Sequence, residues 1–252
     1  MVRHIKSLQT AAMFALAAAL MPAAASAQVV YSQSWESGLD GWTSSGFSGR
    51  PIVVGTSNLA ASDGLSSLSV TQDGEGFSWN TKLEVGDDPG SPLFQSWQAL
   101  ANVPENLARV RFDIVYRGAD IPDTATFLNL SIWLNNRNGF RQIDNLGLLD
   151  GASIASNGDF IVPIDVGFNQ FSGFGDRIPA ADAVLNDFYQ IGWAMNGNFG
   201  AGNGAVDGGP GNPQPGEATV YYDNFRLEVI PEPTGLALIG VGALGLLRRR
   251  RA

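Results

Sequence analysis

The stretch FLNLSIWLNNRNGFRQI, residues 127–143, decides the fold. Its apolar residues recur at every second position from Leu128 to Leu134, so they share one face of an extended strand. The Asn- and Gly-rich residues 135–139 that follow tolerate positive φ and predict a hairpin turn into a strand over residues 140–143. The stretch therefore predicts two antiparallel strands with one buried face.

The rest of the chain repeats this alternation in short segments. Residues 110–116 and 189–195 both place apolar or aromatic side chains at every second position. Glycine and proline, 31 and 13 of the 252 residues, separate such segments and mark turns. Because no linker or repeat interrupts residues 28–230, we predict one all-β domain, an antiparallel β-sandwich.

Two segments depart from the strand pattern. Residues 91–102 have a proline near their start and apolar residues at helical spacing, which predicts a short helix, and residues 180–187 are a second helix candidate. Residues 196–216 are rich in Gly, Asn and Pro. We interpret this last segment as a disordered rather than a functional loop, because no aromatic residue after Phe199 anchors it.

The N-terminal residues 1–27 have the three parts of a secretory signal peptide. Basic Arg3 and Lys6 precede an apolar run over residues 11–20, and small residues end at Ala27. We expect cleavage after Ala27. A permanent membrane anchor is the alternative, but the short alanine-rich run and the Ala-x-Ala site favour cleavage.

The C-terminal residues 231–252 have a second three-part pattern. Pro231, Glu232 and Pro233 precede an uncharged run over residues 234–247, and four arginines follow. A helix of these fourteen residues is roughly 21 Å long, short of the ~30 Å hydrocarbon core, and the arginines favour the cytoplasmic side. The pattern therefore predicts a transient apolar helix in the inner membrane during export, with an ordinary tail anchor as the alternative.

This C-terminal pattern resembles the PEP-CTERM sorting signal. The resemblance implies processing by an exosortase-type transpeptidase in a Gram-negative bacterium that produces exopolysaccharide. It also implies that the mature domain reaches the outer surface or the extracellular biofilm matrix. What the domain binds does not follow from it.

The composition excludes most common catalytic sites and nucleic-acid binding. The chain has no cysteine, and its single histidine, His4, lies in the leader, so disulfides, Ser-His-Asp triads and imidazole-ligated zinc are excluded. Removing the six basic residues and Glu232 at the two ends changes the net charge from −9 to −14. Such a domain repels nucleic acid and anionic lipid and favours divalent cations.

Three motifs resemble jelly-roll carbohydrate-binding modules of the galactose-binding-like type. They are SWESGLDGW at residues 34–42, ASDGLSSLSV at 61–70 and TVYYDNFRL at 219–227. In those modules the first strand often reads aromatic-Glu-x-Gly-x-x-Gly-Trp, and the last reads aromatic-Asp-Asp/Asn-aliphatic. The resemblance spans the mature domain and implies a jelly-roll sandwich that binds carbohydrate.

The same resemblance implies a structural Ca²⁺ where the first and last strands meet. Carried over by motif, Glu36 and Asp223 supply carboxylates, and Asp63 is a third candidate. The apolar phase of the last strand slips between Tyr222 and Phe225, which predicts a bulge that aims Asp223. The alternative is that both carboxylates are merely solvated.

Trp133 is the candidate for stacking on a sugar. It shares its strand face with Asn129, Ser131 and Asn135, so amides would flank a flat ring. Arg111 would join this face if its strand pairs with that of Trp133. The alternative is that a loop or the predicted helix covers Trp133 and that the ring only packs.

We expect a non-catalytic glycan-binding or adhesion module. The tryptophans that we assign to core packing are Trp35, Trp42, Trp79 and Trp193. Catalysis would need convergent carboxylates, and although Asp113 with Glu84 or Asp144 is conceivable, no spacing selects such a pair. A carboxylate-dependent enzyme acting on polysaccharide and a purely structural matrix component are the alternatives.

Overall fold

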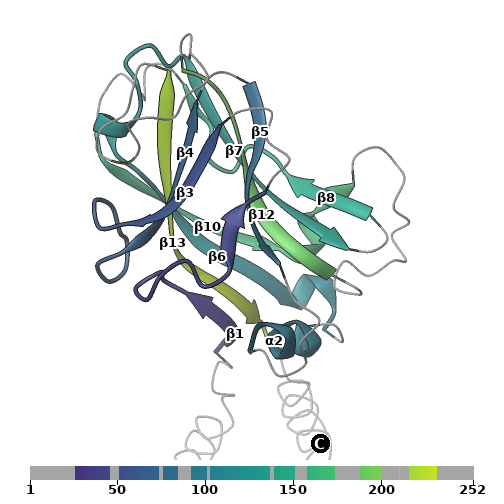
Figure 1. The fold of residues 1–252 in the computed structure, drawn as a ribbon. Coiled ribbons are helices and arrows are strands. Elements are labelled where there is room, and N and C mark those ends of the chain that lie inside the picture. The colour runs from purple at the N-terminus through teal and green to yellow at the C-terminus, as the bar shows by residue number, and fades with distance from the viewer. Residues whose placement is uncertain are drawn as a thin grey trace, which may run out of the picture. The chain divides into compact units, whose positions relative to one another are not determined.

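The computed structural model describes residues 26–45, 51–73, 76–84, 92–100, 103–136, 139–150, 158–173, 188–199, 210 and 216–231. Val29–Val229 forms one compact unit. Two antiparallel sheets build it and share one core, so the predicted β-sandwich of the jelly-roll type is confirmed (Figure 1). The division of the chain at residues 27 and 230 stays a prediction.

The described elements are short strands joined by turns. The strands are β1 (Gln28–Gln33), β2 (Trp42–Ser44), β3 (Ile52–Ser57), β4 (Ser67–Asp73), β5 (Gly76–Glu84), β6 (Ala108–Tyr116), β7 (Phe127–Asn136), β8 (Gly139–Ile143), β9 (Leu149–Asp150), β10 (Phe160–Gly167), β11 (Ser172–Gly173), β12 (Phe188–Asn198) and β13 (Glu217–Val229). The helices are α2 (Pro92–Leu100) and the 3₁₀ turns η1 (Glu105–Leu107), η2 (Gly118–Asp120) and η3 (Phe168–Gln170).

We call the two sheets sheet A and sheet B. Sheet A has the order β10-β6-β13-β4-β3, and β1 also pairs with β13. Sheet B has the order β11-β8-β7-β12-β5-β2, and β9 also pairs with β7. The predicted hairpin is confirmed as β7 and β8, with Ile132 opposite Ile143.

The core lies between the inner faces of the sheets, where the alternation of the sequence places apolar side chains. The inward residues of β6 and β7 are at most 1% exposed: Val110, Phe112, Ile114, Tyr116, Leu128, Leu130, Ile132 and Leu134. Burying a large apolar side chain fully contributes about 1.5–3 kcal/mol. These strands therefore hold the two sheets together.

Stacked aromatic rings form the centre of the core. The Trp193 ring lies between those of Trp42 and Tyr222, with centroids 4.3 Å away on both sides. Phe225 meets Trp42 edge to face at 5.4 Å, and Trp35 does so at 5.8 Å. The core assignment of Trp35, Trp42 and Trp193 is thus confirmed.

The helix predicted over residues 91–102 is confirmed as α2, which lies next to β1 (Figure 1). The Ser96 hydroxyl of α2 donates to the Val30 carbonyl of β1 at 2.6 Å. The second candidate, residues 180–187, lies outside the described residues. The predicted start of the loop over residues 196–216 was wrong. Residues 196–198 are the end of β12 and pair with β7.

The predicted bulge in the last strand is confirmed. The register between β13 and β6 shifts between Asp223 and Arg226, and Asn224 has a φ of 53°. Asn tolerates this left-handed conformation better than most residues. The bulge keeps both Tyr222 and Phe225 in the core.

Within the described part of the chain, no helix has the length and apolar character needed to cross a membrane. The apolar runs predicted over residues 11–20 and 234–247 fall outside that part. Their membrane role stays a prediction.

Candidate functional site

The outer face of sheet B, which points away from the core, carries three of the four residues predicted to bind a ligand: Asn129, Trp133 and Asn135. The β7 residues on it are Asn129, Ser131, Trp133 and Asn135. Opposite them, Trp79 of β5 aligns with Ala194 of β12, and Gly192 aligns with Trp133. Because directly opposed residues of antiparallel strands share a face, one surface combines the rings of β5 and β7 with amides.

Trp133 is buried, so its ring is not an open platform. Its side chain is 2% exposed, and its ring stacks on that of Phe140 at 5.9 Å. The indole N–H donates to the Trp193 carbonyl at 3.0 Å. A Cβ added to Gly192 would lie 2.6 Å from the Trp133 ring and 1.9 Å from the Thr81 carbonyl oxygen. The structure therefore gives Trp133 the packing role in place of the predicted exposed one.

Accessible rings on this face include Phe127 at the start of β7 and a group formed by Phe77, Trp79 and Phe140, which we call the aromatic patch. Phe77 is 39% exposed, and Trp79 and Phe140 are half-buried. Trp79 meets Phe77 edge to face at 5.2 Å and Phe140 at 5.9 Å. The assignment of Trp79 to the core was wrong, since its partner Ala194 lies on the outer face. The spacing of Phe77 and Trp79, two residues apart on one strand face, is the signal that identifies the patch in the sequence.

A row of hydrogen-bonded side chains crosses the same face. The Asn135 amide donates to Gln190 at 3.3 Å, and the Gln190 amide donates to Glu84 at 2.7 Å. Lys82 forms an ion pair with Glu84. The hydrogen bond from Lys82, followed by that from Gln190, lowers the pKa of Glu84 below its ordinary value. Glu84 is therefore ionised at neutral pH, and Lys82 balances its charge.

A second polar group lies at the β7–β8 side of the face. The Ser131 hydroxyl donates to Asp144 at 2.8 Å, and the Gln142 amide donates to the same carboxylate oxygen. The Asn129 amide donates to the side-chain oxygen of Asn145 at 2.9 Å. The amide nitrogens of Asn129 and Gln142 are used in these hydrogen bonds, so their side-chain oxygens remain for other partners.

Three buried polar atoms on this face have no hydrogen-bond partner in the described part of the chain. They are Trp79 Nε1, Asn129 Oδ1 and Gln142 Oε1. Buried polar groups are almost always paired, so water or ligand atoms are candidate partners for these three atoms. The face thus combines apolar rings with unused hydrogen-bonding capacity.

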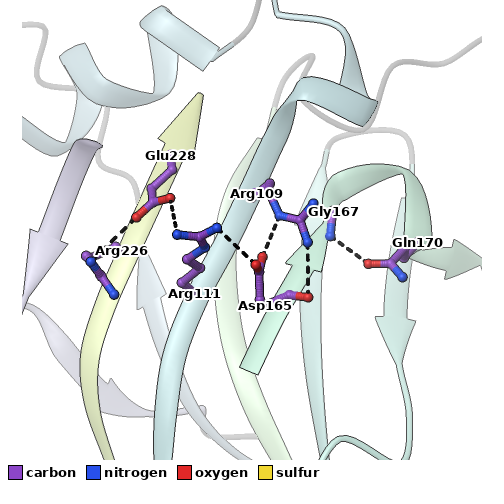
Figure 2. Close-up of polar contacts among 7 residues, drawn as sticks. All are labelled: Arg109, Arg111, Asp165, Gly167, Gln170, Arg226 and Glu228. Carbon is purple, nitrogen blue, oxygen red and sulfur yellow. Dashed lines mark hydrogen bonds and ion pairs between the residues drawn. The ribbon is translucent and has the colours of Figure 1, made fainter. Parts of the chain in front are cut away.

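Arg111 does not join this face. Its strand, β6, pairs with β10 and β13 in sheet A and not with β7. The assumed strand pairing was therefore wrong, and Arg111 lies on the outer face of sheet A. There it pairs with Asp165 at 3.0 Å and with Glu228 at 3.0 Å (Figure 2).

Arg111 belongs to an ionic cluster that crosses three strands. Its members are Arg109, Arg111, Asp165, Arg226 and Glu228 (Figure 2). Burial raises the pKa of Asp165, but the hydrogen bonds and charges of Arg111 and Arg109 outweigh it and hold the pKa below its ordinary value. Every charged group in the cluster has an oppositely charged neighbour, so the cluster ties the three strands together.

Glu36, the first predicted Ca²⁺ ligand, is held by backbone N–H groups. Its Oε1 accepts from Leu65 at 2.7 Å and from Ser66 at 2.8 Å. Gly64 has a φ of 73°, and a Cβ there would lie 2.2 Å from the same oxygen. The loop therefore needs glycine where the carboxylate approaches.

Asp223, the second predicted ligand, is fully buried and reaches the same loop. Its Oδ2 accepts from the backbone N–H groups of Ser62 at 2.7 Å and Asp63 at 2.8 Å, and its Oδ1 accepts from that of Asn224 at 2.7 Å. Burial raises the pKa of Asp223, and hydrogen bonds from Asp63, Asn224 and Ser62 offset this only in part. Asp63 thus contributes a backbone donor, while its side chain is exposed.

The loop over residues 62–66 therefore ties Glu36 to Asp223 through backbone N–H groups. The positive ends of N–H dipoles face oxygens that a cation would also need. Ca²⁺ at these two carboxylates stays a prediction. The described residues contain no group of three His, Cys, Asp or Glu side chains arranged to hold a metal ion.

The carboxylate pairs considered for catalysis lie on different sheets. Asp113 is on the outer face of sheet A, where it accepts from the Ser62 hydroxyl at 2.6 Å. Glu84 and Asp144 belong to the outer face of sheet B. The core lies between the two faces, so neither pair can act on one bond.

The predicted processing positions adjoin the first and last strands. Ala27 directly precedes β1, and Pro231 follows β13 by two residues. Glu232 and Pro233 lie outside the described residues. Cuts at these ends would leave β1 and β13 intact.

The solved structures that are similar to the chain include β-sandwich carbohydrate-binding modules. The CBM22-1 xylan-binding domain of Paenibacillus barcinonensis Xyn10C has 15% identity and a TM-score of 0.40, covering 82% of this chain and 98% of its own. The C-terminal family 22 module of Clostridium thermocellum Xyn10B has 16% identity and a TM-score of 0.37, covering 80% and 94%. The xylan-binding module CBM15 has 12% identity and a TM-score of 0.39, covering 82% and 99%. Similarity at these identities and TM-scores gives no information about a ligand of this chain.

The C-terminus gives a match in sequence. No curated protein matches the chain. Residues 229–251 match the PEP-CTERM protein-sorting motif. The chain therefore carries a signal for export, cell-surface sorting and exosortase processing.

Proposed function

We propose that the chain is an exported surface protein whose sandwich binds polysaccharide without catalysis at the outer face of sheet B. The observation that carries the proposal is the aromatic patch beside three buried, unpaired polar atoms. Aromatic rings pack on the apolar faces of pyranose rings, and well-placed polar groups select the hydroxyl pattern.

The charge of the chain favours a neutral polysaccharide. The mature segment carries a net charge of −14, taken from −9 for the whole chain. Lys82, the cation that the described residues place beside Glu84 on this face, is paired with that carboxylate and is not spare for a uronate or sulfate group. Trp79 Nε1 supplies a donor, while Asn129 Oδ1 and Gln142 Oε1 supply acceptors. These atoms suit hydroxyl groups, which both donate and accept.

The sorting route completes the proposal. The leader is removed after Ala27, and the apolar run over residues 234–247 holds the chain in the inner membrane until an exosortase-type enzyme cuts near Pro231 to Pro233. The product then reaches the outer surface or the matrix, where polysaccharide is its partner. The PEP-CTERM motif supports this order of events.

Affinity electrophoresis of the purified chain in gels that contain xylan, a neutral glucan or an anionic polysaccharide tests the binding face. We expect retardation by a neutral polysaccharide and at least a tenfold loss of affinity in Trp79→Ala, because a central aromatic anchor commonly contributes about 2 kcal/mol or more. Leu65→Ala, which truncates a 77% exposed apolar residue on a sheet A loop, is the matched control.

Equal retardation of the Trp79→Ala variant and the parent chain would remove the aromatic patch from the proposal. Retardation by none of the three polysaccharides would leave a structural matrix role. Release of reducing sugar by the purified chain would contradict the non-catalytic assignment.

A further inference from the structure

Two arginines face each other on the outer face of sheet A. Arg226 of β13 is directly opposite Arg111 of β6, and Glu228 is directly opposite Arg109. Directly opposed residues of antiparallel strands point to the same face, and like charges in this arrangement repel each other. The sheet therefore brings two guanidinium groups to the same surface.

The ionic cluster around these arginines has fewer carboxylates than guanidinium groups. Asp165 accepts a hydrogen bond from Arg109 and lies 3.0 Å from Arg111. Glu228 lies 3.0 Å from Arg111 but 3.7 Å from Arg226, and Figure 2 shows it between the two side chains. Three arginines thus share two carboxylates, which leaves the cluster with one unit of positive charge in excess.

The next outward carboxylate of β6, Asp113, does not balance this excess. It accepts hydrogen bonds from the Ser62 hydroxyl at 2.6 Å and from the Asn224 amide at 3.3 Å. None of the ion pairs in the described ranges includes Asp113. Its charge is therefore satisfied by neutral donors on the other side of the strand bulge.

Arg226 is the member of the cluster with unused donors. A guanidinium group has five N–H donors. Those of Arg226 form no hydrogen bond with the part of the chain that the structure describes, because its 3.7 Å contact with Glu228 is longer than a hydrogen bond. The Arg226 side chain is 37% exposed and that of Arg111 is 34% exposed. Solvent, and therefore a ligand, reaches both arginines.

A carboxylate is the anion that suits this excess. It is planar and accepts two parallel hydrogen bonds from one guanidinium group, and its single charge equals the excess of the cluster. A phosphate monoester shares the hydrogen-bonding chemistry but carries a charge of about −1.5 to −2 at neutral pH. The net charge of −14 of the mature segment repels a second negative charge.

We propose that Arg226 and Arg111 bind the carboxylate of an acidic sugar, a uronate unit of an extracellular glycan. The choice of a sugar rests on the proposed function, whereas the choice of a carboxylate rests on the cluster. The two sheets enclose one core, so this site and the aromatic patch lie on opposite faces of the sandwich. One domain would then hold an acidic glycan on sheet A and a neutral glycan on sheet B.

Equilibrium dialysis of the purified full chain against a short galacturonate oligosaccharide tests the site. A short probe is used because the acidic chain repels a long polyanion. We expect binding in about 20 mM NaCl that weakens in about 0.5 M NaCl. Arg226→Gln should bind the probe roughly tenfold more weakly, because hydrogen bonds to charged groups are the strong ones. Lys82→Gln, which removes the same charge from sheet B, is the matched control and should keep the affinity of the parent chain.

Absence of galacturonate binding by the parent chain would overturn the proposal, as would equal affinities in Arg226→Gln and Lys82→Gln. Inorganic phosphate that binds as tightly as the galacturonate probe would overturn the assignment to a carboxylate. Loss of galacturonate binding in Trp79→Ala would assign the probe to the aromatic patch instead. Failure of the neutral polysaccharides to bind, with galacturonate binding intact, would count against the proposed function of sheet B and would support the site on sheet A.

Discussion

The outer faces of the two sheets differ in the kind of side chain that covers them. On sheet A, charged side chains pair with one another, as Arg111 does with Asp165 and Glu228. On sheet B, aromatic rings cover the strands, and amide and hydroxyl side chains such as those of Asn129 and Ser131 form the hydrogen bonds beside them. A face of paired charges stabilises the fold, whereas a face of accessible rings and neutral amides is the better candidate for a neutral ligand.

The difference between the two faces follows from the size of the outward side chains on one central strand of each sheet, β12 in sheet B and β13 in sheet A. On sheet B the outward residues of β12 include Gly192 and Ala194, and this lack of bulk lets rings from β5, β7 and β8 lie across the strand. On sheet A the outward residues of β13 include Arg226 and Glu228, which fill their own surface. Small residues in the central strand therefore make an aromatic surface possible.

The largest expected effect tests this role of small residues. Gly192→Ala should lower the free energy of unfolding by about 2–3 kcal/mol, since its Cβ would lie 1.9 Å from the Thr81 carbonyl oxygen and the overpacked strand must shift. Gly55→Ala on sheet A is the matched control, because its nearest contact is 3.5 Å away and no large change is expected. Urea unfolding measures both variants, and equal losses would show that glycine has no special role on sheet B.

The next effect compares one ion pair from each face. Arg111→Ala should cost about 1–3 kcal/mol, because it removes a partner from Glu228, whose side chain is 2% exposed. Lys82→Ala on sheet B should cost less than about 1 kcal/mol, since the Glu84 side chain is 54% exposed and water replaces the lysine. Urea unfolding with and without 1 M NaCl measures this, and salt should reduce only the Lys82 effect. A larger loss in Lys82→Ala would contradict the contrast between the faces.

Whether a feature of the fold or the site could be predicted depends on how far apart in the sequence the interacting residues lie. The face that a side chain takes within its strand is a local property, so the alternation around Leu128 and Phe112 predicted the core correctly. Strand order depends on contacts between distant segments, and short alternating strands do not encode it. Arg111 was therefore placed on its correct strand face but next to the wrong strand.

The exposure of side chains on the outer face of sheet B was the second property that the sequence could not predict. Trp133 lies on the predicted face, but Phe140 covers it and Gly192 lies beneath it, and both are contributed by other strands. Trp79 was assigned to the core because its partner Ala194 could not be identified from the sequence. By contrast, the bulge at Asp223 shifts the apolar phase of its own strand, so the sequence alone predicted it.

The smallest expected effect is on the pH dependence of the free energy of unfolding. A carboxylate on each face contributes to it, and the two contributions have opposite signs. The pKa of Glu84 is lowered from 4.5, chiefly by the hydrogen bond from Lys82, so its stabilisation is present above 4.5 and is lost as the pH falls through its lower folded value. The pKa of Asp223 is raised from 3.8, chiefly by burial, so its protonated form stabilises the fold below 3.8 and this contribution is lost as the pH rises through its higher folded value. Urea unfolding between pH 3 and 7 should therefore show a weaker rise in stability with pH for Glu84→Gln and a steeper net rise for Asp223→Asn than for the parent chain. Because the Glu84 carboxylate is exposed to water, the first change should be the smaller, and parallel curves for all three chains would mean that neither face couples its carboxylate to folding.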